Sequence, residues 1–142
     1  MAILFFVMMV INLTLHTIVY QPREIENRQR YILYKIDHVQ VLEACKFIMA
    51  NRPIFHQDPE WHGLDPKDLS RPDPADSRMP AIIRAFDKIS IFAGEDSVQI
   101  EFGGGFRHYG LKAYSGGVMG SGTREIIPHL WYYDENDKIP AP

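Results

Sequence analysis

The residue types that could carry chemistry are concentrated in one stretch, EFGGGFRHYG, at positions 101–110. Its three consecutive glycines would let a backbone approach a ligand closely. The side chains around them supply an acid, two basic groups and a phenol, namely Glu101, Arg107, His108 and Tyr109. These four residues, together with Arg124, are the candidate ligand-binding residues of the chain.

The same glycines have a structural interpretation. The stretch is neither G-x-G-x-x-G between a strand and a helix nor G-x-x-x-x-G-K-[ST], so neither nucleotide-binding motif applies. A glycine run between two strands usually serves a bulge or a turn. If the turn is tight, Glu101 and His108 lie across from one another, and the pair raises the pKa of His108 without implying catalysis. We favour the structural interpretation and predict no catalytic residue.

A second glycine-rich loop, SGGVMGSGT at 115–123, precedes Arg124. Its amides could cradle an anion, but the loop lacks the strand-to-helix setting and the lysine of a specific phosphate site. The aromatic run Leu130 to Tyr133 is expected to pack as a strand. We do not expect it to form a platform for a carbohydrate or an aromatic ligand.

The proline-rich stretch 52–80 is predicted to be a long loop, because it contains six of the ten prolines. It also contains metal-ligating residue types, above all His56, Asp58 and His62. Their spacing matches neither H-E-x-x-H nor a calcium-binding loop, so no metal is predicted there, although a metal site at these three residues stays an alternative.

Several function classes lack their usual residues. No G-x-S-x-G occurs, and Cys45 falls on an apolar helical stripe, where a buried and unreactive thiol is expected. A net charge of −3 argues against a nucleic-acid-binding surface. We predict no cofactor, and an enzyme is less expected than an interaction domain.

The first 20 residues contain 16 apolar residues and no charge. As a helix they would extend about 30 Å, the thickness of the bilayer hydrocarbon core. The segment lacks the basic n-region and the small-x-small cleavage site that are typical of a cleaved signal peptide. We therefore predict a single transmembrane helix over 1–20, in contact with membrane lipid.

The basic residues nearest this segment all follow it, at Arg23, Arg28, Arg30 and Lys35. By the positive-inside rule the globular part then faces the cytoplasm. Residues 21–36 form a connector that could either continue the membrane helix or approach the domain as an extended chain, and Pro22 favours a break after the span.

The pattern of apolar and polar residues over 37–142 predicts an α+β domain. Asp37 is a candidate N-cap for an amphipathic helix that begins near His38 and ends at Asn51, and the pattern of 79–86 is compatible with a short helix. From Ile89 the apolar period changes to two. We expect an antiparallel meander of about four strands, which end at 93, 102, 114 and 133, with both helices packed on it.

Three segments, GGGFRHYG (103–110), GTREIIPHLWYYDE (122–135) and DHVQVLEACKFIMANR (37–52), resemble a group of small, uncharacterised bacterial proteins with a short N-terminal membrane segment. MPAIIRAF (79–86) extends the likeness. The resemblance implies a bacterial membrane-anchored domain and assigns no catalytic residue. Two features depart from it: no basic residue precedes the apolar run, and His129 stands where the group has glycine.

The sequence therefore predicts a membrane-tethered accessory or protein-interaction domain without catalytic activity. The alternative is a small enzyme or ligand-binding domain that uses the glycine turn at 101–110. The protein partner is not predicted by any motif.

Overall fold

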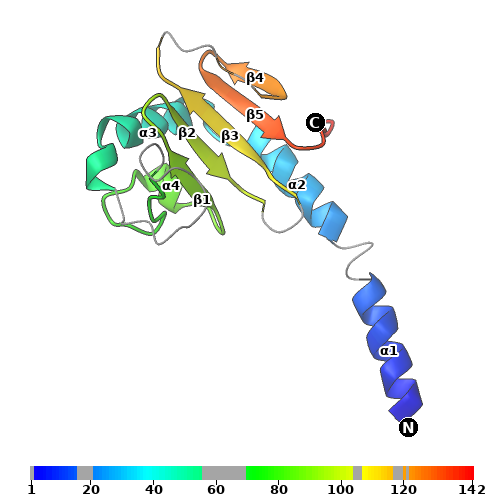
Figure 1. Ribbon diagram of the computed structural model, residues 1–142. Helices are drawn as coiled ribbons and strands as arrows, with labels where there is room; N and C mark the ends of the chain where they lie inside the picture. The colour runs from blue at the N-terminus through cyan, green and yellow to red at the C-terminus, as the bar shows by residue number, and fades with distance from the viewer. Residues whose placement is uncertain (1, 16–20, 56–69, 104–106, 117–119, 121) are drawn as a thin grey trace. The chain divides into compact units, whose positions relative to one another are not determined.

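A computed structural model describes residues 2–15, 21–55, 70–103, 107–116, 120 and 122–142. It gives an α+β fold with a five-stranded antiparallel sheet and a few helices (Figure 1). The chain divides into two compact units. One contains residues 1–35 and 140–142, and the other contains residues 36–139.

The first unit contains two helices, α1 (Ala2–Leu15) and α2 (Gln21–Tyr34). Since α1 has 14 residues, it is about 21 Å long. Within the described residues, no helix is both long enough and apolar enough to cross a membrane. The last part of the predicted span, 16–20, lies outside the described residues. The structure therefore gives a helix in the predicted segment but not the 20-residue span.

The connector at 21–36 is helical over most of its length, as α2. Pro22 is compatible with this, because a proline in the first helical turn removes no helical hydrogen bond. An ion pair one turn apart, from Arg30 to Glu26 at 2.7 Å, supports the exposed side of the helix. At the other end of α2, the Tyr34 hydroxyl donates a hydrogen bond to the Pro140 carbonyl at 3.0 Å, which ties the C-terminal residues to this unit.

The second unit begins with α3 (His38–Ala50), as the capping pattern predicts. The Asp37 carboxylate accepts a hydrogen bond from the Gln40 backbone N–H at 3.0 Å, which satisfies one of the free donors of the first turn. Asn51 ends the helix, and its side-chain amide donates to the Phe47 carbonyl. The apolar stripe is buried at Val41, Leu42, Ala44, Cys45 and Ile48.

Five strands form the sheet: β1 (Ser90–Ala93), β2 (Ser97–Glu101), β3 (Tyr109–Tyr114), β4 (Arg124–Ile127) and β5 (Leu130–Asp134). Their order is β1-β2-β3-β5-β4, and every neighbouring pair is antiparallel. The prediction of about four strands missed β4. This strand joins β5 through Pro128 and His129, and His129 has a φ of 71°.

The two faces of the sheet differ in burial. Alternate residues face α3, which packs against β2, β3 and β4, and they form the core with side chains such as Ile91, Ile100, Leu111 and Tyr132. The short helix α4 (Ala81–Arg84) packs against α3 and buries Ile83. The other face, called here the open face, carries half-buried polar and aromatic side chains.

The proline-rich stretch is partly described. A 3-10 helix, η2 (Arg52–Ile54), follows α3, and the residues at 56–69 lie outside the described chain. Ser70 then pairs with Ala93 at the edge of the sheet, through backbone hydrogen bonds of 2.8 Å in both directions. The end of the loop is therefore fastened to β1.

Candidate functional site

The structure brings Glu101 and His108 together on the open face. Glu101 ends β2 and lies opposite Gly110 of β3, so His108, two residues before Gly110, is its diagonal neighbour. The Glu101 carboxylate lies 2.8 Å from Nδ1 of the His108 ring. The predicted proximity of these two residues across the turn is therefore confirmed.

The pair changes the protonation of the imidazole. The hydrogen bond and the charge of Glu101 raise the pKa of His108 above its usual 6.5, and Glu135 adds to the effect. The His108 side chain is 41% exposed, whereas that of Glu101 is 12% exposed. A carboxylate that holds Nδ1 leaves Nε2 as the ring atom available to a ligand or a proton.

Gly110 lies between Glu101 on one side and Tyr133 on the other. The Tyr133 hydroxyl accepts a hydrogen bond from the Gln99 side-chain amide of β2 at 3.0 Å. The phenol of a β5 residue thus reaches β2 across β3, over the position where Gly110 has no side chain. Burial and the charge of Glu101 raise the pKa of Tyr133, so the phenol stays neutral.

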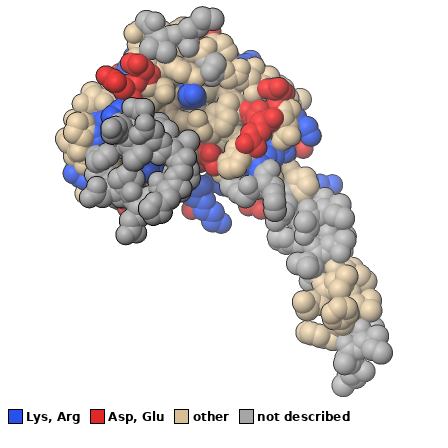
Figure 2. All heavy atoms as spheres, in the orientation of Figure 1, with Lys and Arg blue, Asp and Glu red and all other residues tan. Residues whose placement is uncertain are grey.

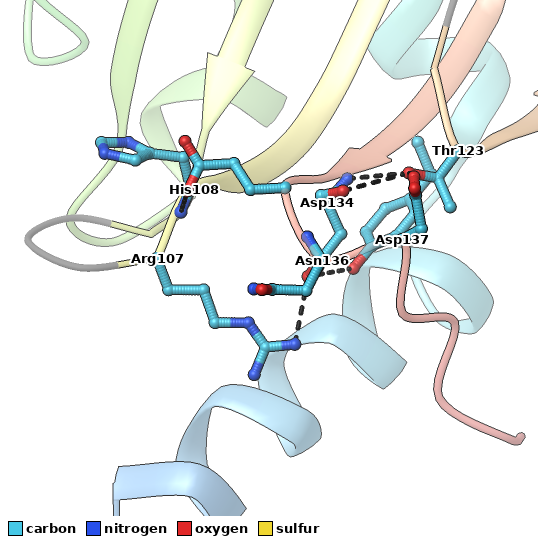
Figure 3. Close-up of polar contacts among 8 residues, drawn as sticks. Arg107, His108, Thr123, Asp134, Asn136 and Asp137 are labelled. Atoms are coloured by element: carbon cyan, nitrogen blue, oxygen red, sulfur yellow. Dashed lines mark hydrogen bonds and ion pairs between the residues drawn. The ribbon is translucent and has the colours of Figure 1, made fainter.

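The Arg107 side chain points away from that of His108 (Figure 3). Its guanidinium donates to the Asp134 carboxylate at 3.2 Å, and the Asp134 side chain is completely buried. Of the buried side-chain polar atoms in the described residues, Arg107 Nε has no hydrogen-bond partner. Since Arg107 is occupied by a structural ion pair, it is not aimed at the Glu101–His108 pair.

Asp134 is the centre of a small polar network that also involves Thr123, Asn136 and Asp137 (Figure 3). Its carboxylate accepts from the Asn136 backbone N–H at 2.8 Å, and its own N–H donates to the Thr123 hydroxyl at 3.0 Å. The Thr123 hydroxyl also donates to the Asp137 carboxylate at 3.3 Å. This network fastens the end of β5 to the start of β4, so its polar groups serve the fold.

The remaining two candidates lie elsewhere. Tyr109 is 2% exposed and belongs to the core. Arg124 is exposed on β4, and it lies opposite Tyr132 rather than beside the open-face pair. Of the five predicted residues, the structure therefore brings two together and distributes three to an ion pair, the core and the sheet edge.

Sequence reasoning missed Asp134, Gln99 and Tyr133. Asp134 is the last residue of the run LWYYD, so the sequence indicated only the end of a strand there. Its partner Arg107 lies 27 residues earlier, and no local pattern links the two. Gln99 and Tyr133 occupy outward positions of alternating strands, which predicts half-burial but not their hydrogen bond. The close packing of Gly120 was also missed: a Cβ at Gly120 would lie 2.1 Å from the Trp131 indole nitrogen.

No group of three His, Cys, Asp or Glu side chains that could hold a metal ion occurs in the described part of the chain. The alternative metal ligands His56, Asp58 and His62 lie outside that part. Burial raises the pKa of the Cys45 thiol to about 12, so Cys45 is not a nucleophile at neutral pH.

Comparison of the chain with models of protein families, with curated proteins and with solved structures finds no match.

Proposed function

We propose that the protein is a membrane-tethered interaction domain without catalytic activity, held to lipid by its N-terminal apolar segment. The observation that carries the proposal is a run of seven exposed apolar side chains on α1. They are 45% to 74% exposed and comprise Phe5, Phe6, Val7, Met8, Met9, Val10 and Ile11. The part of α1 that is coloured in Figure 2 shows no Lys, Arg, Asp or Glu.

The distribution of these side chains favours lipid over a protein groove. Seven consecutive residues occupy almost two helical turns, so apolar groups point in every direction around the axis. A helix that docks in a groove keeps a polar side toward water, whereas a helix surrounded by lipid has none. We infer that the apolar segment 1–20 inserts into a bilayer and, as a single span, anchors the chain.

The absence of catalysis is proposed from the placement of the candidate residues. General acid–base chemistry needs groups that converge within hydrogen-bond reach of one reacting atom. Here Arg107 bonds to Asp134, Tyr109 is buried, and Arg124 lies on β4. The geometry therefore supports binding through surfaces better than it supports turnover.

The alternative function is a small enzyme. It rests on Glu101 and His108, because an imidazole that is oriented by a carboxylate is a common general base. If the domain is a small enzyme, its turnover in a substrate screen must disappear in His108→Ala and fall strongly in Glu101→Gln. Turnover that meets both conditions would replace the interaction proposal. A variant at the distant turn residue, His129→Ala, serves as the control.

Membrane attachment is tested with a charged variant of α1. In Met8→Arg/Ile11→Arg, each arginine adds about 2.5–3.5 kcal/mol to the cost of insertion at a helix centre. We expect the native chain to float with liposomes and to resist alkaline extraction, and the arginine variant to stay in the soluble fraction. The control Met8→Leu/Ile11→Leu keeps the apolar surface and should float. Equal partition of all three proteins would reject the anchor.

The charge rule proposes a cytoplasmic domain, since Arg23, Arg28, Arg30 and Lys35 follow the apolar segment. Protease added to sealed, right-side-out vesicles should then leave residues 36–139 intact until detergent opens the membrane. Digestion without detergent would place the domain on the opposite side.

The interaction role is tested with photo-crosslinkers at two lysines on different surfaces. Lys112 lies on the open face, and Lys46 lies on the exposed side of α3. We expect a discrete protein adduct from position 112 in native membranes and none from position 46. Absence of adducts at both positions would count against an interaction surface on the open face.

A further inference from the structure

His108 lies where three strand ends meet. It immediately precedes β3, and its carbonyl accepts a hydrogen bond from the Glu135 N–H, just after β5, at 3.1 Å. Its own N–H donates to the Glu135 carboxylate at 3.4 Å, while its ring bonds to Glu101 at the end of β2. One residue therefore links β2, β3 and the end of β5.

Charged groups around His108 come from both neighbouring elements. The end of β2 contributes Glu101, and the segment after β5 contributes Glu135. On β5 itself, Tyr133 is neutral, because burial and Glu101 raise the pKa of its phenol. The adjacent Arg107 bonds to Asp134.

The next cation on β3 is Lys112, whose ammonium lies 5.2 Å from the centre of the Tyr114 ring. Among the cations named here, His108 is the one that, when protonated, places a positive charge on the Glu101 carboxylate and within the field of Glu135. When the imidazole is neutral, the ring loses its charge attraction to Glu101 and Glu135.

We propose that His108 forms a pH-sensitive clamp, called here the strand-end clamp, which closes the ends of β2, β3 and β5 when the imidazole is protonated and loosens them when it is neutral. The clamp sits beside the backbone hydrogen bond from the Phe102 N–H to the Tyr109 carbonyl, at 3.0 Å. Phe102 is buried, and its ring centre lies 5.0 Å from that of Phe86. Opening of the clamp therefore loosens the last core residue after β2.

The direction of the pH effect follows from the protonation of the ring. The pKa of His108 is raised by Glu101, so its stabilising contribution is fully present below the unfolded value of 6.5. That contribution is lost as the pH rises through the raised, folded value. The clamp is closed in mild acid and loosened in mild base.

The test is amide hydrogen exchange by NMR on the full chain in detergent micelles, between pH 5.5 and 8.5. Protection of the Phe102 and Glu135 amides is divided by that of Ile100, after correction for the intrinsic pH dependence. We expect this ratio to fall about threefold as His108 deprotonates, the size of an exposed ion pair. In His108→Gln the ratio should not vary with pH, and in Glu101→Gln, which keeps Glu135, its fall should be much smaller than in the native chain.

Two further measurements distinguish the clamp from a general effect of pH on stability. The ring resonance of His108 should titrate at a lower pH in Glu101→Gln than in the native chain, while His129→Gln should keep the native exchange profile. A native ratio that does not change with pH, or an equal fall in His108→Gln, would overturn the proposal. If His108→Gln does not fold, Glu101→Gln decides the matter, because a fall as large as in the native chain would overturn the proposal.

Discussion

Tyr133 on β5 bonds to Gln99 on β2 at 3.0 Å, across the intervening strand β3. The residue of β3 beneath this crossing is Gly110, which lies opposite Tyr133 in the sheet register. Gly110 has no side chain there, so nothing on β3 at this position obstructs the hydrogen bond between the two flanking strands.

Gly110→Ala should destabilise the domain by about 2–3 kcal/mol, the cost of an overpacked site. A Cβ at this position would lie 2.0 Å from the Ile100 carbonyl oxygen, so β2 and β3 would have to separate. Urea unfolding of the full chain in detergent measures the change. The matched control is Gly116→Ala, because a Cβ there meets nothing within 4 Å, and its effect should stay within about 0.5 kcal/mol. Equal effects of the two variants would contradict this account.

Asp134→Ala should cost about 3 kcal/mol or more, because it leaves the partly buried Arg107 guanidinium without its carboxylate and removes the acceptor of the Asn136 N–H. Arg107→Ala/Asp134→Ala should be less destabilising than the sum of the two single variants. As a control, Glu26→Gln removes an exposed ion pair, to Arg30, and should cost at most about 0.5 kcal/mol. Thermal unfolding compares the two single variants, the double variant and the control. An Asp134→Ala variant with an unchanged Tm would show that the buried pair contributes little to stability.

His129→Gly should raise the free energy of unfolding by about 0.5–1 kcal/mol. The φ of His129 is 71°, and a residue with a Cβ is strained in this left-handed region, whereas glycine is not. The residue lies in the β4–β5 turn, where glycine would adopt this backbone angle at least cost. His129→Ala removes the same ring but keeps the Cβ, so it should bring no gain. A higher Tm for both variants would instead implicate the loss of the imidazole.

Cys45 should resist alkylation in the folded chain. Its thiol is buried and has a pKa of about 12, so roughly one part in ten thousand is thiolate at pH 8. Mass spectrometry after iodoacetamide treatment should show an unmodified chain in buffer and complete modification in denaturant. Rapid modification of the native protein would mean that α3 opens locally.

Local sequence was sufficient where a structure depends on neighbouring residues. Asp37 caps α3 because its carboxylate reaches an N–H three residues later, and the alternation from Ser97 to Glu101 gives β2 a buried face. The proximity of Glu101 and His108 was also predictable, since the two residues flank one turn and share a face of the sheet. The charge-free character of the first 20 residues is likewise a property of the sequence alone.

Tertiary structure decided the features that depend on distant partners. β4 was missed because its sequence, REII, is too short to show a period, and it becomes a strand through pairing with β5. Arg107 was a candidate for ligand binding until the fold placed it beside Asp134, 27 residues away. Alternation and spacing determine which way a side chain points, but only the packed sheet determines which group it meets. For this protein the sequence determined α3, β2 and the apolar segment, and the register of the strands decided which of the candidate residues share a site.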